Sequence, residues 1–383
     1  MFDLIRNADV YAPEPLGIKQ LLVCAGKIVH LSDEPPVLDE RLEVRVTDID
    51  GARLTPGFID AHSHITGGGG EAGPSTRVPP LHLSQFTSAG VTSVVGLLGT
   101  DDLTRNTQTL LTQVMGLREE GLSAWCYTGG YHVPATTLTG SVRSDIVNLE
   151  PVIGVGEVAI SDHRSSQPTR DEILRIASDA HDAGLMTGKA GIVHLHLGDG
   201  DRKLSLVNEC LNSTELPARV FNPTHINRNR PLFEEACALS KRGCWVDITA
   251  FPHEPNTSGW NTDDAVKRYI DGGFPLEKLT ISSDGGGCLP HFDAQGELQS
   301  MGFAKSQALP DALASLLGAD LTLDTVLPLL TSNVATLLRL HRKGKIAVGA
   351  DADLLVLDNQ HRIDHVMANG AWHVVDKNEK HFG

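Results

Sequence analysis

The sequence predicts an α/β protein in which a large barrel of parallel strands and helices is joined to a small domain of strands. Three observations lead to this prediction. Short apolar segments alternate with helix-length segments over residues 56–344, residues 1–55 and 345–383 contain only short strand-like segments, and no long apolar run interrupts the chain. Alternation of strands and helices is typical of a parallel sheet, and a stretch of this length suits an eight-stranded barrel.

The two ends of the chain predict the small domain. Each end contains short segments rich in apolar residues, separated by Pro and Gly, which is typical of strands and turns. These segments are residues 9–12, 20–23, 27–30, 352–357, 363–366 and 371–375. The dipeptide Asn369-Gly370 is a typical hairpin turn. Because sets of strands this short are not stable alone, we predict that residues 1–55 and 345–383 pair into one domain.

The middle of the chain predicts the barrel. Its apolar, strand-like segments are residues 92–97, 124–127, 152–160, 191–197, 245–248 and 279–282. Residues 233–242 and 311–317 have the pattern of connecting helices. An open doubly wound sheet would give the same alternation and is the alternative, but neither of the glycine motifs that bind nucleotide phosphates on such sheets occurs. The glycine run Gly67–Gly70 has no Lys after it, which argues against a phosphate site.

Composition and charge restrict the classes of partner. The formal net charge of −16 argues against nucleic acid and anionic membranes, since both select clustered Lys and Arg. The start Met1-Phe2-Asp3-Leu4 lacks the regions of a signal peptide, and no apolar run approaches the roughly 20 residues of a membrane-spanning helix. We therefore expect a soluble, cytoplasmic protein. The six cysteines include no CxxC pair, so a disulfide framework is not expected.

The strongest local motif is Pro56-Gly57-Phe58-Ile59-Asp60-Ala61-His62-Ser63-His64, in a chain with 17 histidines. Residues two apart on a strand point to the same face, so His62 and His64 can reach one metal ion together. Imidazole is a preferred ligand of zinc and related metals. A pair of structural histidines is the alternative, but this pair follows a strand and enters a glycine loop.

Four further segments place candidate ligands at or near the ends of apolar strands. Glu157 lies inside the apolar segment 152–160, where a buried carboxylate is costly and a neighbouring cation is the simplest explanation. The other three segments are Val193-His194-Leu195-His196-Leu197-Gly198-Asp199, Asn222-Pro223-Thr224-His225-Ile226-Asn227 and Thr280-Ile281-Ser282-Ser283-Asp284-Gly285. Each segment alone is best explained by a structural role. Because the carboxyl ends of barrel strands form one active face, together they predict a metal site.

These motifs together resemble the amidohydrolase superfamily, with its PGFIDxHxH segment, a mid-chain strand carboxylate or lysine, two later strand-end histidines and a final SSDG. The resemblance implies a (β/α)8 TIM barrel with a small β-sandwich domain built from both termini. A narrower set of segments resembles the isoaspartyl (β-aspartyl) dipeptidases, namely residues 67–74, 96–101, 131–134, 160–165 and 224–229. This resemblance runs from about residue 56 to residue 285.

The resemblance implies a site for two divalent metal ions, with Zn²⁺ as the default. The implied ligands are His62, His64, Glu157, His196, His225 and Asp284. The first two histidines and Asp284 would hold one ion, and the later two histidines the other. Glu157 occupies the position of the bridging ligand, where isoaspartyl dipeptidases have a carboxylated lysine and other branches of the superfamily have glutamate. A mononuclear site with Glu157 merely paired is the alternative. His194 is expected to pack behind the ligands.

The resemblance also implies hydrolysis of the β-aspartyl linkage of dipeptides by a hydroxide that bridges the two metals. Asp284 would be the general base and acid, and Tyr131 would donate a hydrogen bond to the developing oxyanion. The implied substrate-binding residues are Glu71, Thr100, Arg164, Arg228 and Cys288. The arginines would bind a carboxylate and Glu71 the substrate ammonium. Cys288 replaces a serine of the family. Each arginine has a structural ion pair as its alternative, which for Arg164 is with Asp162.

Two other functions stay open. Another amidohydrolase that acts on cyclic amides or N-acyl amino acids, such as a dihydroorotase-like enzyme or a deacylase, would keep the metal ligands and dispense with Glu71 or Arg228. A metal-binding scaffold without catalysis is the alternative outside enzymes, and Asp284 and Tyr131 beside a full ligand set argue against it. The resemblance further implies a homo-oligomer, for which an octamer is one candidate.

Overall fold

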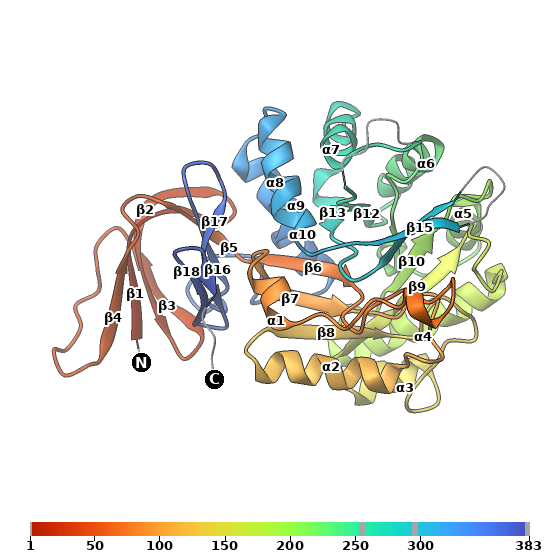
Figure 1. Ribbon diagram of the computed structural model, residues 1–383, viewed down its shortest axis with the longest axis horizontal. Coiled ribbons are helices and arrows are strands. Elements are labelled where there is room, and N and C mark those ends of the chain that lie inside the picture. Colours follow the sequence, from red (N-terminus) through yellow and green to blue (C-terminus); the bar gives the residue numbers. More distant parts are fainter. Residues whose placement is uncertain (1, 253–257, 293–297, 380–383) are drawn as a thin grey trace.

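The computed structural model describes residues 2–252, 258–292 and 298–379. Its larger part is a barrel of eight parallel strands surrounded by helices (Figure 1). The barrel strands are β6 (Phe58–Ser63), β7 (Val91–Gly96), β8 (Ser123–Thr128), β9 (Val152–Ile160), β10 (Val193–Leu197), β11 (Phe221–Thr224), β12 (Val246–Thr249) and β13 (Leu279–Ser282). Strands β6 to β11 pair in sequence order, and β12 pairs with β13. The predicted (β/α)8 barrel is confirmed, and the open doubly wound alternative is wrong.

Two short junctions close the barrel. A parallel bridge joins Ser63, the last residue of β6, to Gly285, which follows β13. Between β11 and β12, the N–H of Ile226 donates to the carbonyl of Asp247 at 3.3 Å, and the Asn227 side chain adds two hydrogen bonds. Asn227 Nδ2 donates to the carbonyl of Thr249 at 3.0 Å, and Asn227 Oδ1 accepts from the Thr249 N–H at 3.0 Å. The carboxamide thereby satisfies both backbone groups of Thr249 at the rim of the barrel.

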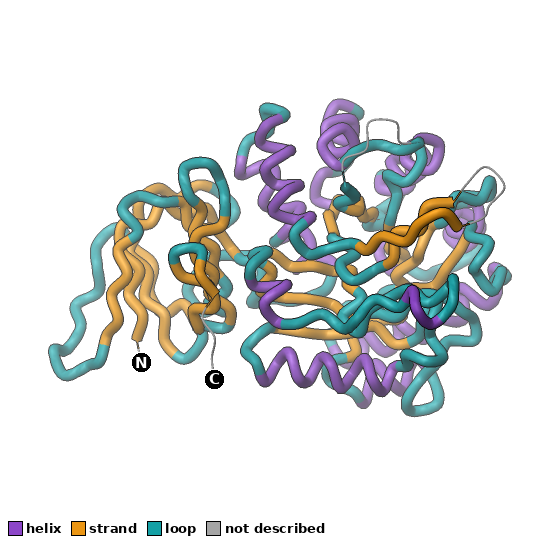
Figure 2. Tube along the Cα trace, viewed as in Figure 1, coloured by secondary structure: helices purple, strands orange, loops and turns teal. Residues whose placement is uncertain are grey.

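The helices around the barrel are α1 (Leu83–Thr87), α2 (Thr107–Glu119), α3 (Val142–Asn148), α4 (Arg170–Thr187), α5 (Ser205–Asn212), α6 (Arg230–Ser240), α7 (Thr262–Asp271), α8 (Ala308–Gly318), α9 (Leu323–Leu330) and α10 (Ser332–Leu337). Helix α4 shows how the sequence sets such boundaries. Thr169 and Glu172 form a capping box at its start, and Gly188 ends it in the left-handed conformation. Figure 2 shows that helices cover the barrel, while the other lobe consists of strands and loops.

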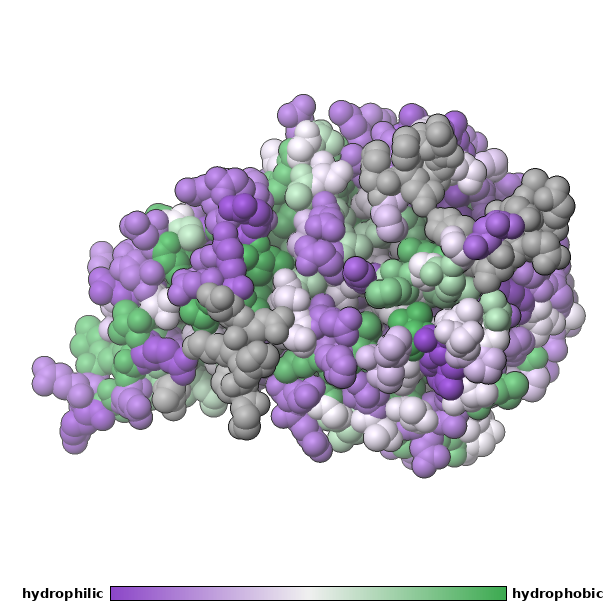
Figure 3. Space-filling view, viewed as in Figure 1, coloured by the Kyte–Doolittle hydropathy of each residue, from purple (hydrophilic) through white to green (hydrophobic). Residues whose placement is uncertain are grey.

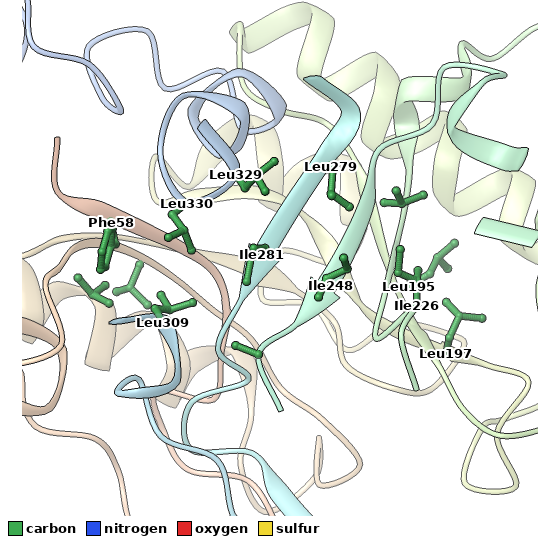
Figure 4. Close-up of a cluster of buried hydrophobic side chains, with 14 of the residues drawn as sticks. Phe58, Leu195, Leu197, Ile226, Ile248, Leu279, Ile281, Leu309, Leu329 and Leu330 are labelled. Atoms are coloured by element: carbon green, nitrogen blue, oxygen red, sulfur yellow. The ribbon is translucent and has the colours of Figure 1, made fainter. Parts of the chain in front are cut away.

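Alternation along the barrel strands separates apolar from polar side chains. On β10, Leu195 and Leu197 join a buried hydrophobic cluster with Ile281 of β13 and the surrounding helices (Figure 4). The intervening His194 and His196 therefore point to the opposite side, into the barrel. This division explains why a buried strand alternates leucine with histidine.

Strands from both ends of the chain form one nine-stranded sheet. Its members are β1 (Phe2–Tyr11), β2 (Pro15–Cys24), β3 (Lys27–Ser32), β4 (Val44–Asp48), β5 (Arg53–Pro56), β16 (Leu354–Leu357), β17 (Ile363–Ala368), β18 (Ala371–Val375) and β19 (Asn378–Glu379). The order is β19-β18-β17-β16-β5-β1-β2-β3, with β4 paired to β1. Apolar residues of both halves, such as Ile5, Leu21, Val356 and Trp372, pack into one core.

The sheet passes directly into the barrel. Strand β5 pairs with β16 and ends at Pro56, and only Gly57 separates it from β6. The domain boundaries at 55/56 and 344/345 stay a prediction.

Several details of the fold differ from the expectation. Strands β1 and β2 are longer than the predicted segments, and β4 lies where no strand was predicted. A hairpin of β14 (Cys288–Phe292) and β15 (Leu298–Phe303), also not predicted, follows the last barrel strand. The turn at Asn369-Gly370 is confirmed, and both residues have positive φ, 47° and 79°. Among the described residues, no helix combines the length and the apolar character that a bilayer-crossing segment requires.

Candidate metal centre and its pocket

The six predicted metal ligands converge at the carboxyl ends of the barrel strands, and all six are buried. Three lie on strands and three lie one or two residues after a strand: His62 in β6, Glu157 in β9, His196 in β10, His64 after β6, His225 after β11 and Asp284 after β13. Because the strands are parallel, these positions meet at one end of the barrel. The structure therefore brings the predicted set together.

Glu157 lies at the centre of the cluster. Its Oε1 is 3.3 Å from His64 Nε2, and its Oε2 is 3.5 Å from His62 Nε2. The same Oε2 lies 3.1 Å from His196 Nδ1 and 3.6 Å from His225 Nε2. One carboxylate thus reaches all four histidines of the predicted ligand set.

The donor atoms fit divalent metal ions. Asp284 Oδ1 lies 3.4 Å from His62 Nε2 and 3.2 Å from His64 Nε2. Two groups of three ligand atoms lie within 4.8 Å of one another: His62 with His64 and Asp284, and His62 with Glu157 and His225. Within the described part of the chain, His62 Nε2 and Asp284 Oδ1 are buried without a hydrogen-bond partner. Such a set of nitrogen and oxygen donors suits zinc and related metals.

The ionised carboxylates of the cluster also favour binding of a cation. Burial alone would raise the pKa of Glu157, but His62 and His196 outweigh it and hold this pKa well below its usual range. Burial likewise opposes the effect of His62 and His64 on Asp284, whose pKa is lowered. In turn, contacts with the two carboxylates overcome burial and raise the pKa of His64 to about 10. The carboxylates are therefore ionised, and metal binding would displace protons from the imidazoles.

His194 orients His62 from behind. Asn222 Nδ2 donates to the carbonyl of Trp245 at 3.4 Å, which directs Asn222 Oδ1 toward His194 Nδ1 at 2.7 Å. His194 donates there, so its Nε2 accepts from Nδ1–H of His62 at 2.8 Å. Burial, assisted by the neighbouring His62, lowers the pKa of His194 to about 3 and keeps this ring neutral. The relay retains a proton on His62 Nδ1 and directs Nε2 toward the carboxylates.

Replacing His194 by leucine is expected to weaken zinc binding about 10- to 100-fold, the usual cost of removing a group that orients a metal ligand. The measurement is competition between the apo-protein and a chromophoric zinc chelator. His181→Leu is the matched control, because His181 lies on α4 and is only partly buried. Equal zinc affinity of His194→Leu and the wild type would contradict the orienting role.

His196 is held through both ring nitrogens. Its Nδ1 lies 3.1 Å from Glu157 Oε2 and 2.9 Å from the hydroxyl of Tyr131, and its Nε2 lies 3.0 Å from Asp162 Oδ2. Burial opposes but does not prevent a lowered pKa of Asp162, because His196 and Arg164 contact it. The ionised Asp162 accepts a hydrogen bond from Nε2–H of His196, which leaves Nδ1 directed toward Glu157. Burial raises the pKa of Tyr131 well above its ordinary value, so its hydroxyl keeps its proton.

Two of the predicted ligands have unusual backbone conformations. His225 has φ 60° and Asp284 has φ 54°, both in the left-handed region. Non-glycine residues in such conformations cost roughly 1–3 kcal/mol and gather at functional sites. His225 is further fixed by a 2.7 Å hydrogen bond between its Nδ1 and Thr249 Oγ1. The backbone conformation of both residues, and at His225 also this hydrogen bond, therefore set the direction of the two side chains.

A cavity of about 1010 Å³ adjoins the cluster. Its lining includes Tyr131 and all five predicted substrate-binding residues: Glu71, Thr100, Arg164, Arg228 and Cys288. Thr100 Oγ1 is buried without a hydrogen-bond partner among the described residues. Burial raises the pKa of the Cys288 thiol, which stays protonated and donates to Glu71 Oε1 at 3.1 Å.

The two arginines differ in their partners. Arg164 donates to Asp162 from Nε at 3.0 Å and from Nη2 at 2.8 Å, and its Nη1 lies 3.4 Å from Glu71 Oε1. The structural ion pair considered for Arg164 is therefore present. The guanidinium of Arg228 has no ion pair or side-chain hydrogen bond within residues 2–252, 258–292 and 298–379. Arg228 is the arginine better placed to receive a carboxylate.

Sequence analysis missed two parts of the pocket. Asp162 was considered only as a partner of Arg164, although its position two residues after β9 marked it as a strand-end carboxylate. An apolar wall formed by Phe251, Trp260, Leu289 and Phe303 was not predicted either. These four residues lie in loops or in the β14–β15 hairpin, where no periodic pattern distinguishes them.

Comparison with known proteins shows that this chain is similar to amidohydrolases. The profile of the Amidohydrolase family matches residues 53–373. A structure of the beta-aspartyl dipeptidase from Fervidobacterium islandicum AW-1, in complex with a beta-Asp-Leu dipeptide, has 42% sequence identity and a TM-score of 0.93, with 100% of both chains covered. The dihydroorotase of Lactiplantibacillus plantarum is 22% identical over 95% of this chain and 90% of its own. A D-hydantoinase structure with 16% identity and a TM-score of 0.67 covers 99% of this chain and 96% of its own, and shares the fold.

Proposed function

The chain belongs to the amidohydrolase family, and from this premise we propose that it hydrolyses the β-aspartyl linkage of dipeptides. It is a metal-dependent hydrolase that acts on peptide bonds. One observation carries the narrower proposal: Glu71 and Arg228, whose guanidinium has no partner among the described residues, line the same cavity as the ligand cluster. A β-aspartyl dipeptide carries an ammonium that can pair with Glu71 and carboxylates that can pair with Arg228. Similarity over the full length to a beta-aspartyl dipeptidase supports this substrate.

We propose that the cluster binds two divalent metal ions, with Zn²⁺ as the first candidate. The residues that would hold them are His62, His64, Glu157, His196, His225 and Asp284. Bound metals supply Lewis-acid polarisation of the carbonyl and lower the pKa of water near them. The contacts of Glu157 with all four histidines support its role as the shared ligand.

Two side chains of the cavity would act on the reacting groups. The carboxylate of Asp284 accepts a proton from the attacking water and returns it to the amine that leaves as the C–N bond breaks. Its lowered pKa keeps it ionised and ready to accept that proton. The hydroxyl of Tyr131, protonated because of its raised pKa, donates a hydrogen bond to the carbonyl oxygen as negative charge develops there.

Other side chains would hold the substrate. Glu71 binds the α-ammonium of the aspartyl residue, and Arg228 binds a carboxylate. Arg164 forms ion pairs with Asp162 and Glu71. It would therefore orient Glu71 in addition to lining the substrate cavity. Thr100 and Cys288 offer hydrogen bonds from the lining of the cavity.

We also propose that the protein is a homo-oligomer that uses the small sheet domain in its contacts, with an octamer as one candidate. Several large hydrophobic residues are exposed there, including Leu16, Ile18, Val29, Leu42 and Val46. On the face seen in Figure 3, hydrophobic side chains gather on this lobe among mostly hydrophilic surface. Exposed apolar patches of this kind are typical of protein contacts. Light scattering coupled to size exclusion measures the oligomeric state.

The function is tested by hydrolysis of β-aspartyl-leucine, α-aspartyl-leucine and dihydroorotate with apo-enzyme reloaded with counted zinc. We expect selective cleavage of the β-linked dipeptide, with activity rising until two zinc ions are bound per chain. Cleavage of dihydroorotate alone would support the cyclic-amide alternative. A folded, zinc-loaded protein that leaves β-aspartyl-leucine intact would overturn the proposal.

A further inference from the structure

The loop of residues 66–78, which follows β6 and carries Glu71, folds back on itself. The N–H of Val78 donates to the carbonyl of Gly68 at 2.9 Å, so the outgoing and returning limbs are paired. Gly67 has φ 76°, and a Cβ there would lie 1.9 Å from the carbonyl oxygen of Val78. A glycine is therefore required for the two limbs to approach. The backbone at Glu71 faces solvent, whereas its side chain is only 19% exposed and points into the cavity.

Arg105, which precedes helix α2, ties the two limbs of this loop together. On the outgoing limb its Nε donates to the carbonyl of Thr66 at 3.1 Å and its Nη1 to the carbonyl of Gly69 at 3.3 Å. On the returning limb its Nη2 donates to the carbonyl of Val78 at 2.9 Å. The residue is 5% exposed, so these hydrogen bonds are shielded from water. One buried guanidinium thus satisfies three loop carbonyls at once.

The same guanidinium is fixed from the opposite side. Arg105 Nη1 lies 3.1 Å from Asp101 Oδ2, and the Asp101 carboxylate also accepts from the N–H of Thr104 at 2.8 Å. Asp101 directly follows Thr100, which lines the cavity. The arrangement therefore connects the segment that carries Thr100 with the loop that carries Glu71. Arg105 itself does not line the cavity, so it acts on a substrate only through the loop.

We propose that Arg105 is a positioning residue for substrate recognition: it holds the 66–78 loop so that Glu71 faces the α-ammonium of the β-aspartyl residue. This inference rests on the proposed function, because it assigns Glu71 to that ammonium. A planar guanidinium with five donors can reach carbonyls on both limbs, whereas a lysine ammonium at the same site cannot reproduce that fork. Arg105→Lys keeps the charge and removes the fork.

The test compares Arg105→Lys, Glu71→Gln and the double variant on β-aspartyl-leucine and on N-succinyl-leucine, which lacks only the α-amino group. We expect Arg105→Lys to raise KM for β-aspartyl-leucine roughly 10- to 100-fold, the range of one lost hydrogen bond to a charged group. Its kcat stays within about threefold, because the metal ligands and Asp284 keep their places. The same substitution is expected to change KM and kcat for N-succinyl-leucine less than about threefold. In the double variant, it is expected to cause no further increase in KM beyond that of Glu71→Gln alone.

Arg118→Lys is the matched control, since Arg118 lies at the far end of helix α2 and also donates to a backbone carbonyl, that of Ala124. Equal losses on both substrates, or losses that add to those of Glu71→Gln, would assign Arg105 a structural role only and overturn the proposal. If Arg105→Lys does not fold, Asp101→Asn is the variant to measure. It leaves the guanidinium in place but weakens the contact that anchors it, so we expect a smaller increase in KM for β-aspartyl-leucine.

Amide hydrogen exchange separates this proposal from the proposed function. If the wild type does not cleave β-aspartyl-leucine, the substrate assignment fails. Exchange over residues 66–78 is nevertheless expected to be faster in Arg105→Lys than in the wild type, at an unchanged unfolding temperature. Unchanged exchange in that loop would show that Arg105 does not hold it.

Discussion

Replacing Glu157 by glutamine is expected to lower kcat/KM about 10²- to 10³-fold, the order of loss when one group of a preorganised electrostatic site is removed. Bound zinc is expected to fall from two ions per chain to one or none. Both oxygens of Glu157 contact histidines of the ligand set, at 3.1 to 3.6 Å. A neutral amide keeps the shape but presents one weakly basic oxygen, so two cations lose their shared anion. Zinc content by mass spectrometry and kinetics on β-aspartyl-leucine measure the two effects.

Glu150→Gln is the matched control for this substitution. Glu150 lies just before β9, at the opposite end of the strand that carries Glu157, and its side chain is 70% exposed. The control is expected to keep both zinc ions and full activity. Because glutamate is permanently carboxylated, the wild type should also regain activity on reloading without bicarbonate. Full activity of Glu157→Gln with a single zinc ion would instead favour the mononuclear alternative.

Replacing Asp284 by asparagine is expected to lower kcat about 10²- to 10⁴-fold, the usual contribution of a general acid–base, with a smaller change in KM. Asparagine is the informative substitution, because Asp284 has φ 54° and asparagine tolerates the left-handed region better than alanine does. The loss is expected to be smaller on β-aspartyl-p-nitroanilide, because p-nitroanilide is a much better leaving group than the amine of leucine and depends less on a proton delivered as the C–N bond breaks. Comparing kcat on the anilide and on β-aspartyl-leucine therefore isolates proton delivery.

Two checks accompany this measurement. Asp320→Asn makes the same change at an exposed residue with φ 65°, and it is expected to leave kcat unaltered. Zinc content must be measured in parallel, since Asp284 is also a candidate ligand. Equal losses of kcat on both substrates at full zinc content would show that Asp284 does not deliver the proton and acts as a metal ligand only.

Much of the barrel could be predicted because its signals are local. The segment 152–160 coincides with β9, and residues 279–282 coincide with β13, since buried parallel strands form continuous apolar runs. Strand β4 was missed because Val44–Asp48 is exposed or only partly buried, and its two valines alternate with polar residues, on a strand that pairs with β1 alone. The β14–β15 hairpin was missed because it packs over the barrel end rather than within a layer. Its position depends on tertiary contacts that no local pattern records.

The ligand set could be predicted because strand ends mark it, whereas the hydrogen bonds that orient it could not. His194 and Asn222 are 28 residues apart in sequence yet 2.7 Å apart in space, and only adjacent strands bring them together. Arg105 illustrates the same limit, because the three loop carbonyls that it binds lie 27 to 39 residues away in sequence. A motif identifies a donor or acceptor, but folding decides which group it meets.

The pairing of β5 with β16 has a consequence for biosynthesis. Strand β5 leads through Gly57 into the strand that carries His62, but its partner comes from Leu354–Leu357, after every barrel strand has been translated. On the ribosome, the barrel can therefore begin to assemble while one edge of β5 still lacks its neighbour. Unpaired strand edges are prone to wrong pairing during that interval. The sheet next to β6, the strand that carries His62, is therefore completed only after β16 near the carboxyl end of the chain has been synthesised.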